Sequence, residues 1–230
     1  MATNDIQLMQ FFPNTHIEMG AVIPSTCRID SGCTIGAKSR LGQVVRLDRD
    51  VQLLGSVILQ RAVVIGHSAV LVGPLEIGEE VILAAGVKVG VKMAVGDVLA
   101  SLTRIRQGAH IGVNAEVMGG VILGEHCRVR AGSRVLGDVP AYGLAGGDPA
   151  ILENFVCSNC SSILHPIRRV NLVVDFGCPA CGQTKTRIST NEDRPKPGHV
   201  LLPGGKSWEQ VSMIGSDPRW DDGLEMRWRG

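Results

Sequence analysis

The stretch of sequence that decides the fold runs from Ile65 to Val89 and reads IGHSAVLVGPLEIGEEVILAAGVKV. Every sixth residue in it, counted from Ile65, is aliphatic. The same spacing extends upstream to Ile17 and, after one break beyond Val95, downstream to Val135. A helix repeats every 3.6 residues and a simple strand every two, so neither gives a period of six. A fixed repeat of this length indicates a solenoid of stacked, equivalent units.

Each six-residue unit has the form expected of a short strand followed by a sharp corner. The aliphatic residue is expected to fill the interior, and small residues such as Gly66 and Ala69 let the chain turn. Three units make one triangular coil, and coils stack about 4.8 Å apart by hydrogen bonds between strands. The repeat therefore predicts six to seven coils in a prism about 30 Å tall. A continuous aliphatic core explains a composition that is 44% hydrophobic but only 3% aromatic.

This pattern resembles the left-handed parallel β-helix of the hexapeptide-repeat acyltransferases, over about residues 14–153. The segment 138–150, DVPAYGLAGGDPA, is similar to the one that closes the prism in bacterial serine, sugar and polysaccharide acetyltransferases. The resemblance implies an all-β fold. Two positions depart from the family motif. Asp148 replaces an Asn, and Ile151 replaces a Lys that helps to hold the coenzyme A phosphates.

Four segments are expected along the chain: a lead at 1–13, the β-helix at 14–153, a cysteine segment at 154–189 and an irregular tail at 190–230. An uncovered prism end is an exposed sheet edge, so we expect the lead to cover it. The apolar residues available for this are Leu8, Met9, Phe11 and Phe12. The tail is rich in Pro, Gly and charge, which is typical of disorder. It also holds Trp208, Trp220 and Trp228, which favour docking on a neighbouring subunit instead.

Composition narrows the class of protein. The formal net charge of +1 gives no electrostatic argument for a nucleic acid or an anionic membrane as partner. The amino terminus lacks the pattern of a signal peptide, and no apolar stretch approaches about 20 residues. We therefore expect a cytoplasmic protein. Cys27, Cys33 and Cys127 lie in the repeat region as small side chains near corners, an arrangement that suits a reducing compartment.

The remaining four cysteines have the spacing of two zinc knuckles. They form two C-x-x-C pairs, Cys157 with Cys160 and Cys178 with Cys181. Two such turns complete a tetrahedral four-cysteine site, which has no open position for water and is therefore structural. Residues 167–174, between the knuckles, suit a β-hairpin. A redox role would need a thioredoxin-like context, which this sequence lacks. We expect a zinc ribbon that serves in scaffolding or subunit contact.

Acyl transfer to a hydroxyl or amine needs a base that takes the proton as the nucleophile attacks the thioester. In the resembled family this base is a histidine between two subunits of a trimer, so the resemblance implies a homotrimer. Counting units modulo three, with four extra residues at the break, places four histidines on one edge of the prism. These are His16, His67, His110 and His126. The same count adds Gln107 and Glu125, with Lys88 between His67 and His110 and Arg128 directly above His110.

This edge predicts the catalytic residues His110, His67 and Glu125, where a histidine serves as base and the carboxylate orients it. The coenzyme, acetyl-CoA or another acyl-CoA, is expected to meet cations and the closing motif. The residues assigned to it are Lys88, Arg104, Arg106, Arg128, Gly146 and Gly147. The alternative for each of these side chains is a solvated corner residue.

Three functions compete. The leading hypothesis is a coenzyme A-dependent acyltransferase that acts on a sugar or small metabolite. The loop at 96–104, where related enzymes place a base, contains no histidine, which favours a non-catalytic trimeric scaffold instead. Residues 65–73 also resemble a metal-binding segment of γ-class carbonic anhydrases. Val72 stands where the second histidine ligand would be, so that three-histidine site lacks a ligand.

Overall fold

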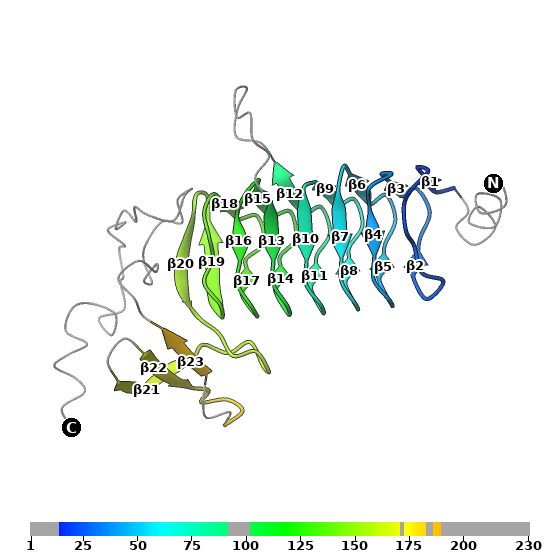
Figure 1. Ribbon diagram of the computed structural model, residues 1–230. Coiled ribbons are helices and arrows are strands. Elements are labelled where there is room, and N and C mark those ends of the chain that lie inside the picture. Colours follow the sequence, from blue (N-terminus) through cyan, green and yellow to red (C-terminus); the bar gives the residue numbers. More distant parts are fainter. Residues whose placement is uncertain (1–13, 92–101, 171–172, 183–185, 190–230) are drawn as a thin grey trace.

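A computed structural model describes residues 14–91, 102–170, 173–182 and 186–189 of the chain. The described residues form a left-handed β-helix of seven coils, which confirms the predicted fold class (Figure 1). They contain no helix, and none of them therefore belongs to a helix that could span a membrane. The predicted cap at 1–13 and the tail at 190–230 lie outside the described residues.

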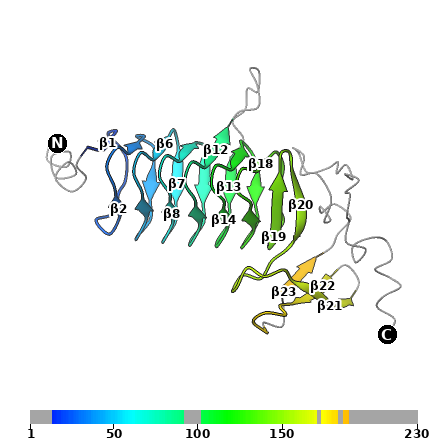
Figure 2. The ribbon, with the colours of Figure 1, turned by 180° about the vertical axis from the view of Figure 1, so that it is seen from behind.

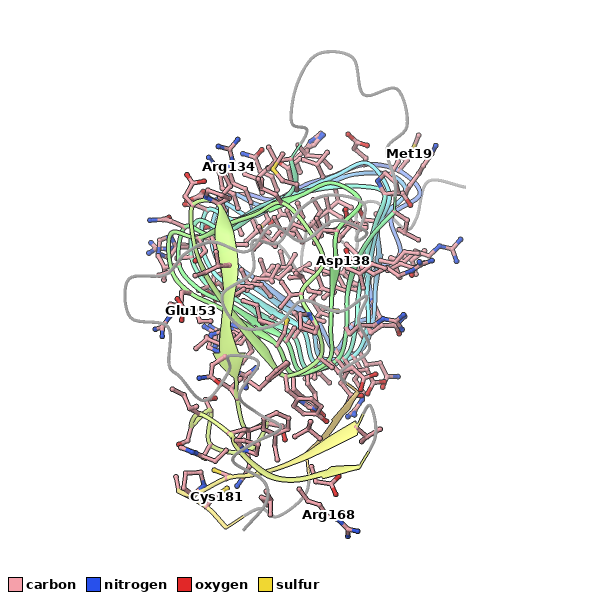
Figure 3. The ribbon with its side chains drawn as sticks, turned by 90° about the vertical axis from the view of Figure 1, so that its left-hand side faces the viewer. Met19, Arg134, Asp138, Glu153, Arg168 and Cys181 are labelled. Carbon is pink, nitrogen blue, oxygen red and sulfur yellow. The ribbon has the colours of Figure 1, made fainter. Side chains whose placement is uncertain are left out.

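Three parallel sheets form the faces of the prism, and each is named here by its first strand. The β1 face is built of β1 (His16–Ile17), β3 (Thr34–Ile35), β6 (Gln52–Leu54), β9 (Val70–Val72), β12 (Lys88–Val91), β15 (Glu116–Met118) and β18 (Arg134–Val135). The β4 face is built of β4 (Arg40–Leu41), β7 (Val57–Leu59), β10 (Leu75–Ile77), β13 (Thr103–Ile105) and β16 (Ile122–Leu123). The β2 face is built of β2 (Arg28–Ile29), β5 (Arg46–Leu47), β8 (Val64–Ile65), β11 (Ile82–Leu83), β14 (His110–Ile111), β17 (Arg128–Val129), β19 (Gly143–Gly147) and β20 (Ala150–Phe155). Viewed along its axis, the prism has a triangular outline (Figure 3).

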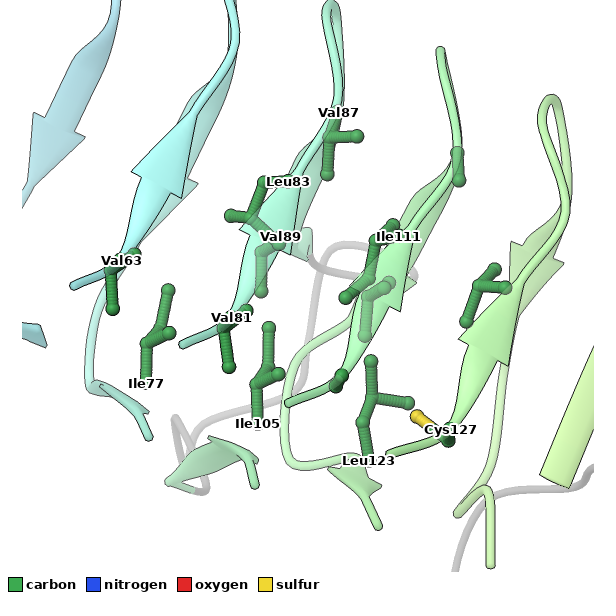
Figure 4. Packing of buried hydrophobic residues seen from close by; sticks show 14 of the residues in the cluster. Val63, Ile77, Val81, Leu83, Val87, Val89, Ile105, Ile111, Leu123 and Cys127 are labelled. Carbon is green, nitrogen blue, oxygen red and sulfur yellow. The ribbon is translucent and has the colours of Figure 1, made fainter. Parts of the chain in front are cut away.

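The core is a double ladder of buried side chains. The predicted aliphatic position of each unit points inward, as at Ile65 and Leu83, which are 0% and 1% exposed. The residue two places earlier is buried as well, as at Val63 and Val81 (Figure 4). Cysteines occupy this second position three times, at Cys27, Cys33 and Cys127, which confirms their expected role as small corner residues. Because two residues per unit are buried, the core fills without aromatic side chains.

The corners require a left-handed backbone conformation. At the corner between the β2 and β1 faces, one residue per coil has a positive φ, and the residue types there tolerate it well. They are Asn14, Gly32, Asp50, Ser68, Gly86, Asn114 and Gly132. The corner between the β4 and β2 faces places less suitable residues in the same conformation, including His126 at φ 53° and Tyr142 at φ 61°. Backbone strain is therefore concentrated at the upper end of this second corner.

The insertion after β12 is longer than the predicted four residues. Successive strands on the β4 face are 18 residues apart, as between Val57 and Leu75, but Leu75 pairs with Thr103, which is 28 residues further on. The insertion is therefore ten residues, and Val95 falls between Val91 and Thr103 instead of occupying a repeat position. Val95 matches the six-residue period without belonging to a coil. Every residue after the break is consequently turned by one face relative to the predicted register.

The last coil ends in an antiparallel pair, because β20 folds back on β19 and covers the edge of the β2 face. The chain then enters a three-stranded antiparallel sheet of β21 (His165–Val170), β22 (Val173–Gly177) and β23 (Thr186–Ser189). This sheet lies beside the β19–β20 end of the prism in both ribbon views (Figures 1 and 2). Phe155 and Phe176 pack together with ring centroids 5.5 Å apart and continue the prism core into the cysteine segment.

Candidate active site and cysteine cluster

The predicted single edge is wrong, because the ten-residue insertion divides its residues between two corners. His16, His67 and Lys88 lie at the corner between the β2 and β1 faces, as the count before the break predicts. The residues after the break lie instead at the corner between the β4 and β2 faces or just beyond it. These are Gln107, His110, Glu125, His126 and Arg128. Lys88 therefore does not lie between His67 and His110. His110 stands above Ile82.

His110 and Arg128 are neighbours, as expected. They begin β14 and β17, and the parallel register pairs them directly on the β2 face. His110 is exposed along its outer edge, but partial burial against the face lowers the pKa of its imidazole, and the positive charge of Arg128 lowers it further. The ring forms no hydrogen bond with any residue in the described part of the chain. A neutral imidazole with available nitrogens is what a general base requires.

Arg128 is a half-buried cation without a carboxylate partner among the described residues. Its Nη1 donates hydrogen bonds to the backbone carbonyls of Gly108, at 2.8 Å, and Cys127, at 3.3 Å. Its Nε donates to the Ser161 hydroxyl at 3.3 Å. These acceptors fix the guanidinium but leave its charge uncompensated, which favours binding of an anionic group.

Glu125 does not orient a histidine. Its side chain is exposed and forms no hydrogen bond or ion pair within the described ranges. Its neighbour His126 stacks on Tyr142, with ring centroids 5.5 Å apart, and covers the Gly108 backbone. The sequence gave no sign of this stack, because the last coil is two residues shorter than the others at this corner. The contact secures the strained corner immediately beside the Arg128 strand.

The other corner holds a separate polar group. Lys88 Nζ lies 2.8 Å from Glu116 Oε1, and this hydrogen bond and charge lower the pKa of Glu116. His67 lies one coil below Lys88, and its Nδ1 is 3.5 Å from the Ser68 hydroxyl. Sequence reasoning missed Glu116, which is 28 residues from Lys88 and aligns with it only when the ten-residue insertion is counted.

The remaining residues assigned to the coenzyme are dispersed. Arg104 lies on the β4 face, where its Nε is 3.2 Å from Glu76 Oε2, and Arg106 is exposed at the next corner. Gly146 lies beneath an ion pair in which Arg130 Nε is 2.5 Å from Glu153 Oε2. Gly147 forms the β19–β20 turn at φ 98°. None of these four residues contacts the His110–Arg128 pair.

The four cysteines of the two knuckles come together. All four sulfur atoms lie within 4.8 Å of one another. The Cys157–Cys181 and Cys160–Cys178 sulfur pairs are 3.7 and 3.4 Å apart. A tetrahedral zinc site with Zn–S bonds of about 2.3 Å separates its sulfurs by about 3.8 Å. Hydrogen bonds involving Ser162 lower the pKa of Cys160 to about 6, toward the thiolate form that a metal needs. The donor set thus fits one zinc ion.

The comparisons with known proteins agree with the fold. Residues 102–137 match the family described as "Bacterial transferase hexapeptide (six repeats)", and this stretch contains His110, Glu125 and Arg128. The N-acyltransferase AntD from Bacillus cereus, solved with dTDP and 3-hydroxybutyryl-CoA, has a TM-score of 0.50 and 17% identity. The match covers 67% of this chain and 88% of that one. Fold and repeat together place the chain among the hexapeptide-repeat proteins of acyltransferase type.

Two enzymes share significant sequence similarity with the chain. The dTDP-3-amino-3,6-dideoxy-alpha-D-galactopyranose 3-N-acetyltransferase of Aneurinibacillus thermoaerophilus is 45% identical over 62 residues, which are 27% of this chain and 32% of that enzyme. Serine acetyltransferase 4 of Arabidopsis thaliana is 32% identical over 126 residues, which are 54% of this chain and 30% of that enzyme. The chain thus spans about a third of the length of the curated relatives it matches.

Proposed function

We propose that this protein is a coenzyme A-dependent acyltransferase whose acceptor is an amine or hydroxyl of a small metabolite. The observation that carries the proposal is the His110–Arg128 pair, which lies within the stretch that matches the transferase repeat. The similarity to a dTDP-amino-sugar acetyltransferase favours the amino group of a nucleotide-linked sugar as acceptor.

In the proposed mechanism His110 is the general base. The acceptor nitrogen or oxygen attacks the thioester carbonyl as the imidazole takes its proton. The carbon–sulfur bond then breaks, and the coenzyme A thiolate recovers the proton. Arg128 binds a phosphate of the coenzyme or of the acceptor, because its charge has no carboxylate partner in the described part of the chain. His67 is the second candidate base, and Lys88 beside it is already paired with Glu116.

Steady-state assays that detect the free thiol of coenzyme A would test this proposal. Acetyl-CoA should be supplied with dTDP-amino sugars or with serine as acceptor. The His110→Gln variant should lower kcat by roughly 10²- to 10⁴-fold, the usual contribution of a general base. His16→Gln, at the opposite end of the prism, is the matched control and should retain activity. Full activity in His110→Gln together with loss in His67→Gln would move the base to the other corner.

A homotrimer is part of the proposal, because the resembled family forms its sites between subunits. Its acceptor pocket would then contain residues from a second copy. Light scattering should give three times the chain mass of 24.5 kDa. A folded trimer that binds no coenzyme A in isothermal titration would instead favour the scaffold function.

The four cysteines are proposed to bind one structural zinc ion. The support is the closeness of their sulfurs to the tetrahedral spacing, at 3.7 and 3.4 Å. Four thiolates leave no coordination position for substrate, so this metal would stabilise the cysteine segment and take no part in the chemical step. Metal analysis of the purified protein should find about one zinc per chain.

A further inference from the structure

The first cysteine knuckle rests on the coil that carries Arg128. Ser161 follows Cys160 directly, and its hydroxyl accepts the hydrogen bond from Arg128 Nε at 3.3 Å. On its other side the guanidinium donates to the Gly108 carbonyl at 2.8 Å. Arg128 is therefore held between the prism and the cysteine segment. Ser161 is the contact that the cysteine segment contributes.

The knuckle is itself tied to the prism through its backbone. The Val156 amide donates to the Tyr142 carbonyl at 2.8 Å, and the Tyr142 amide donates to the Glu125 carbonyl at 2.7 Å. Within the turn, the Ser161 amide donates to the Cys157 carbonyl at 2.9 Å, and Ser161 has a left-handed φ of 58°. The position of the Ser161 hydroxyl therefore depends on a turn whose two ends, Cys157 and Cys160, belong to the four-cysteine cluster.

We infer that Ser161 is a positioning residue through which the metal-loaded knuckle holds Arg128 beside His110. The inference rests on the function proposed above. It gives the zinc ion a second role, because the metal would order a ligand-binding cation on the prism as well as stabilise the cysteine segment. Without the metal, the turn loses the constraint on Cys157 and Cys160, and the Ser161 hydroxyl is no longer fixed against the guanidinium.

The test compares Ser161→Ala with Ser158→Ala in the zinc-loaded protein. Ser158 belongs to the same turn, and within the described residues it makes no hydrogen bond to the prism. The first readout is the pKa of His110 by NMR, assigned with the His110→Gln variant. Releasing Arg128 moves a positive charge away, so the pKa should rise in Ser161→Ala but not in Ser158→Ala. The second readout is the affinity for coenzyme A, which should fall about 3- to 10-fold in Ser161→Ala, as for one lost hydrogen bond.

Two further samples separate the explanations. Ser161→Gly suits the left-handed backbone, so the same effects in this variant cannot come from strain. Removal of zinc by a chelator should raise the pKa of His110 in the parent protein, as Ser161→Ala does. If the pKa of His110 stays unchanged in Ser161→Ala and after zinc removal, the inference is overturned. If the pKa rises as expected while coenzyme A fails to bind even the parent protein, the positioning role stands and the proposed function fails.

Discussion

Stacking of the coils at Gly112 offers a quantitative test of the fold beneath the candidate site. Gly112 comes two residues after His110, and its φ is not in the left-handed region. A Cβ atom at this position would lie 2.5 Å from the Ala131 amide nitrogen of the next coil. An ordinary contact of at least 3.4 Å would require the two coils to separate by about 0.9 Å, in a stack whose normal spacing is about 4.8 Å.

The expected cost of Gly112→Ala follows from that displacement. The Gly112 amide donates to the Val129 carbonyl at 2.8 Å, and the Gly132 amide donates to the Val113 carbonyl at 2.8 Å. Both bonds cross the gap that would open. Weakening them costs about 1 kcal/mol each, and overpacking adds roughly 1–3 kcal/mol, so the free energy of unfolding should fall by about 3–5 kcal/mol.

Gly132→Ala is the matched control. Gly132 has a left-handed φ of 69°, and nothing lies within 4 Å of an added Cβ. This variant should lose only about 1–2 kcal/mol, the cost of that conformation for a residue with a side chain. Chemical denaturation of both variants, followed by circular dichroism, compares the two costs. A Gly112→Ala variant as stable as Gly132→Ala would contradict the close stacking of the coils.

Three further predictions concern the site. If His110 is the base, kcat/KM should rise with pH through a midpoint below about 6.5, because its lowered pKa keeps the imidazole neutral in milder acid. Arg128→Gln should move this midpoint to higher pH. Lys88→Gln should leave the pKa of His110 unchanged and raise that of Glu116, observed by carboxyl NMR, because it removes the hydrogen bond that lowers it. Cys181→Ser should abolish stoichiometric zinc binding and increase hydrogen exchange in β21 and β22, while protection of the strands from β3 to β11 is retained.

Much of the fold could be predicted because the repeat reports directly which side chains point inward. The aliphatic positions from Ile29 to Val89 are all buried as expected, and the knuckle spacing identified the cysteine cluster. The length of the insertion could not be obtained in this way, because Val95 satisfies the period without occupying a coil. A hydrophobic ladder shows which residues face the core, but it contains no information on which face of the prism a strand belongs to.

A second signal for the correct register lies in the corner residues. Residues that tolerate a left-handed backbone recur every 18 positions from Asn14 to Gly86, and the next in the series is Asn114. The step of 28 from Gly86 to Asn114 contains the ten-residue insertion. Corner chemistry thus fixes the face that the aliphatic ladder leaves open, because each corner selects its own residue types.

The corrected register changes what each polar residue can do. In the predicted register Lys88 would have added a second cation beside His110. In the structure Lys88 is neutralised by Glu116 on a different corner, and Arg128 alone acts on His110. A single cation held by backbone carbonyls and by Ser161 lowers the pKa of the imidazole while keeping its own charge available. The chemistry at this corner therefore depends on the contact between the prism and the cysteine segment, which the repeat alone could not reveal.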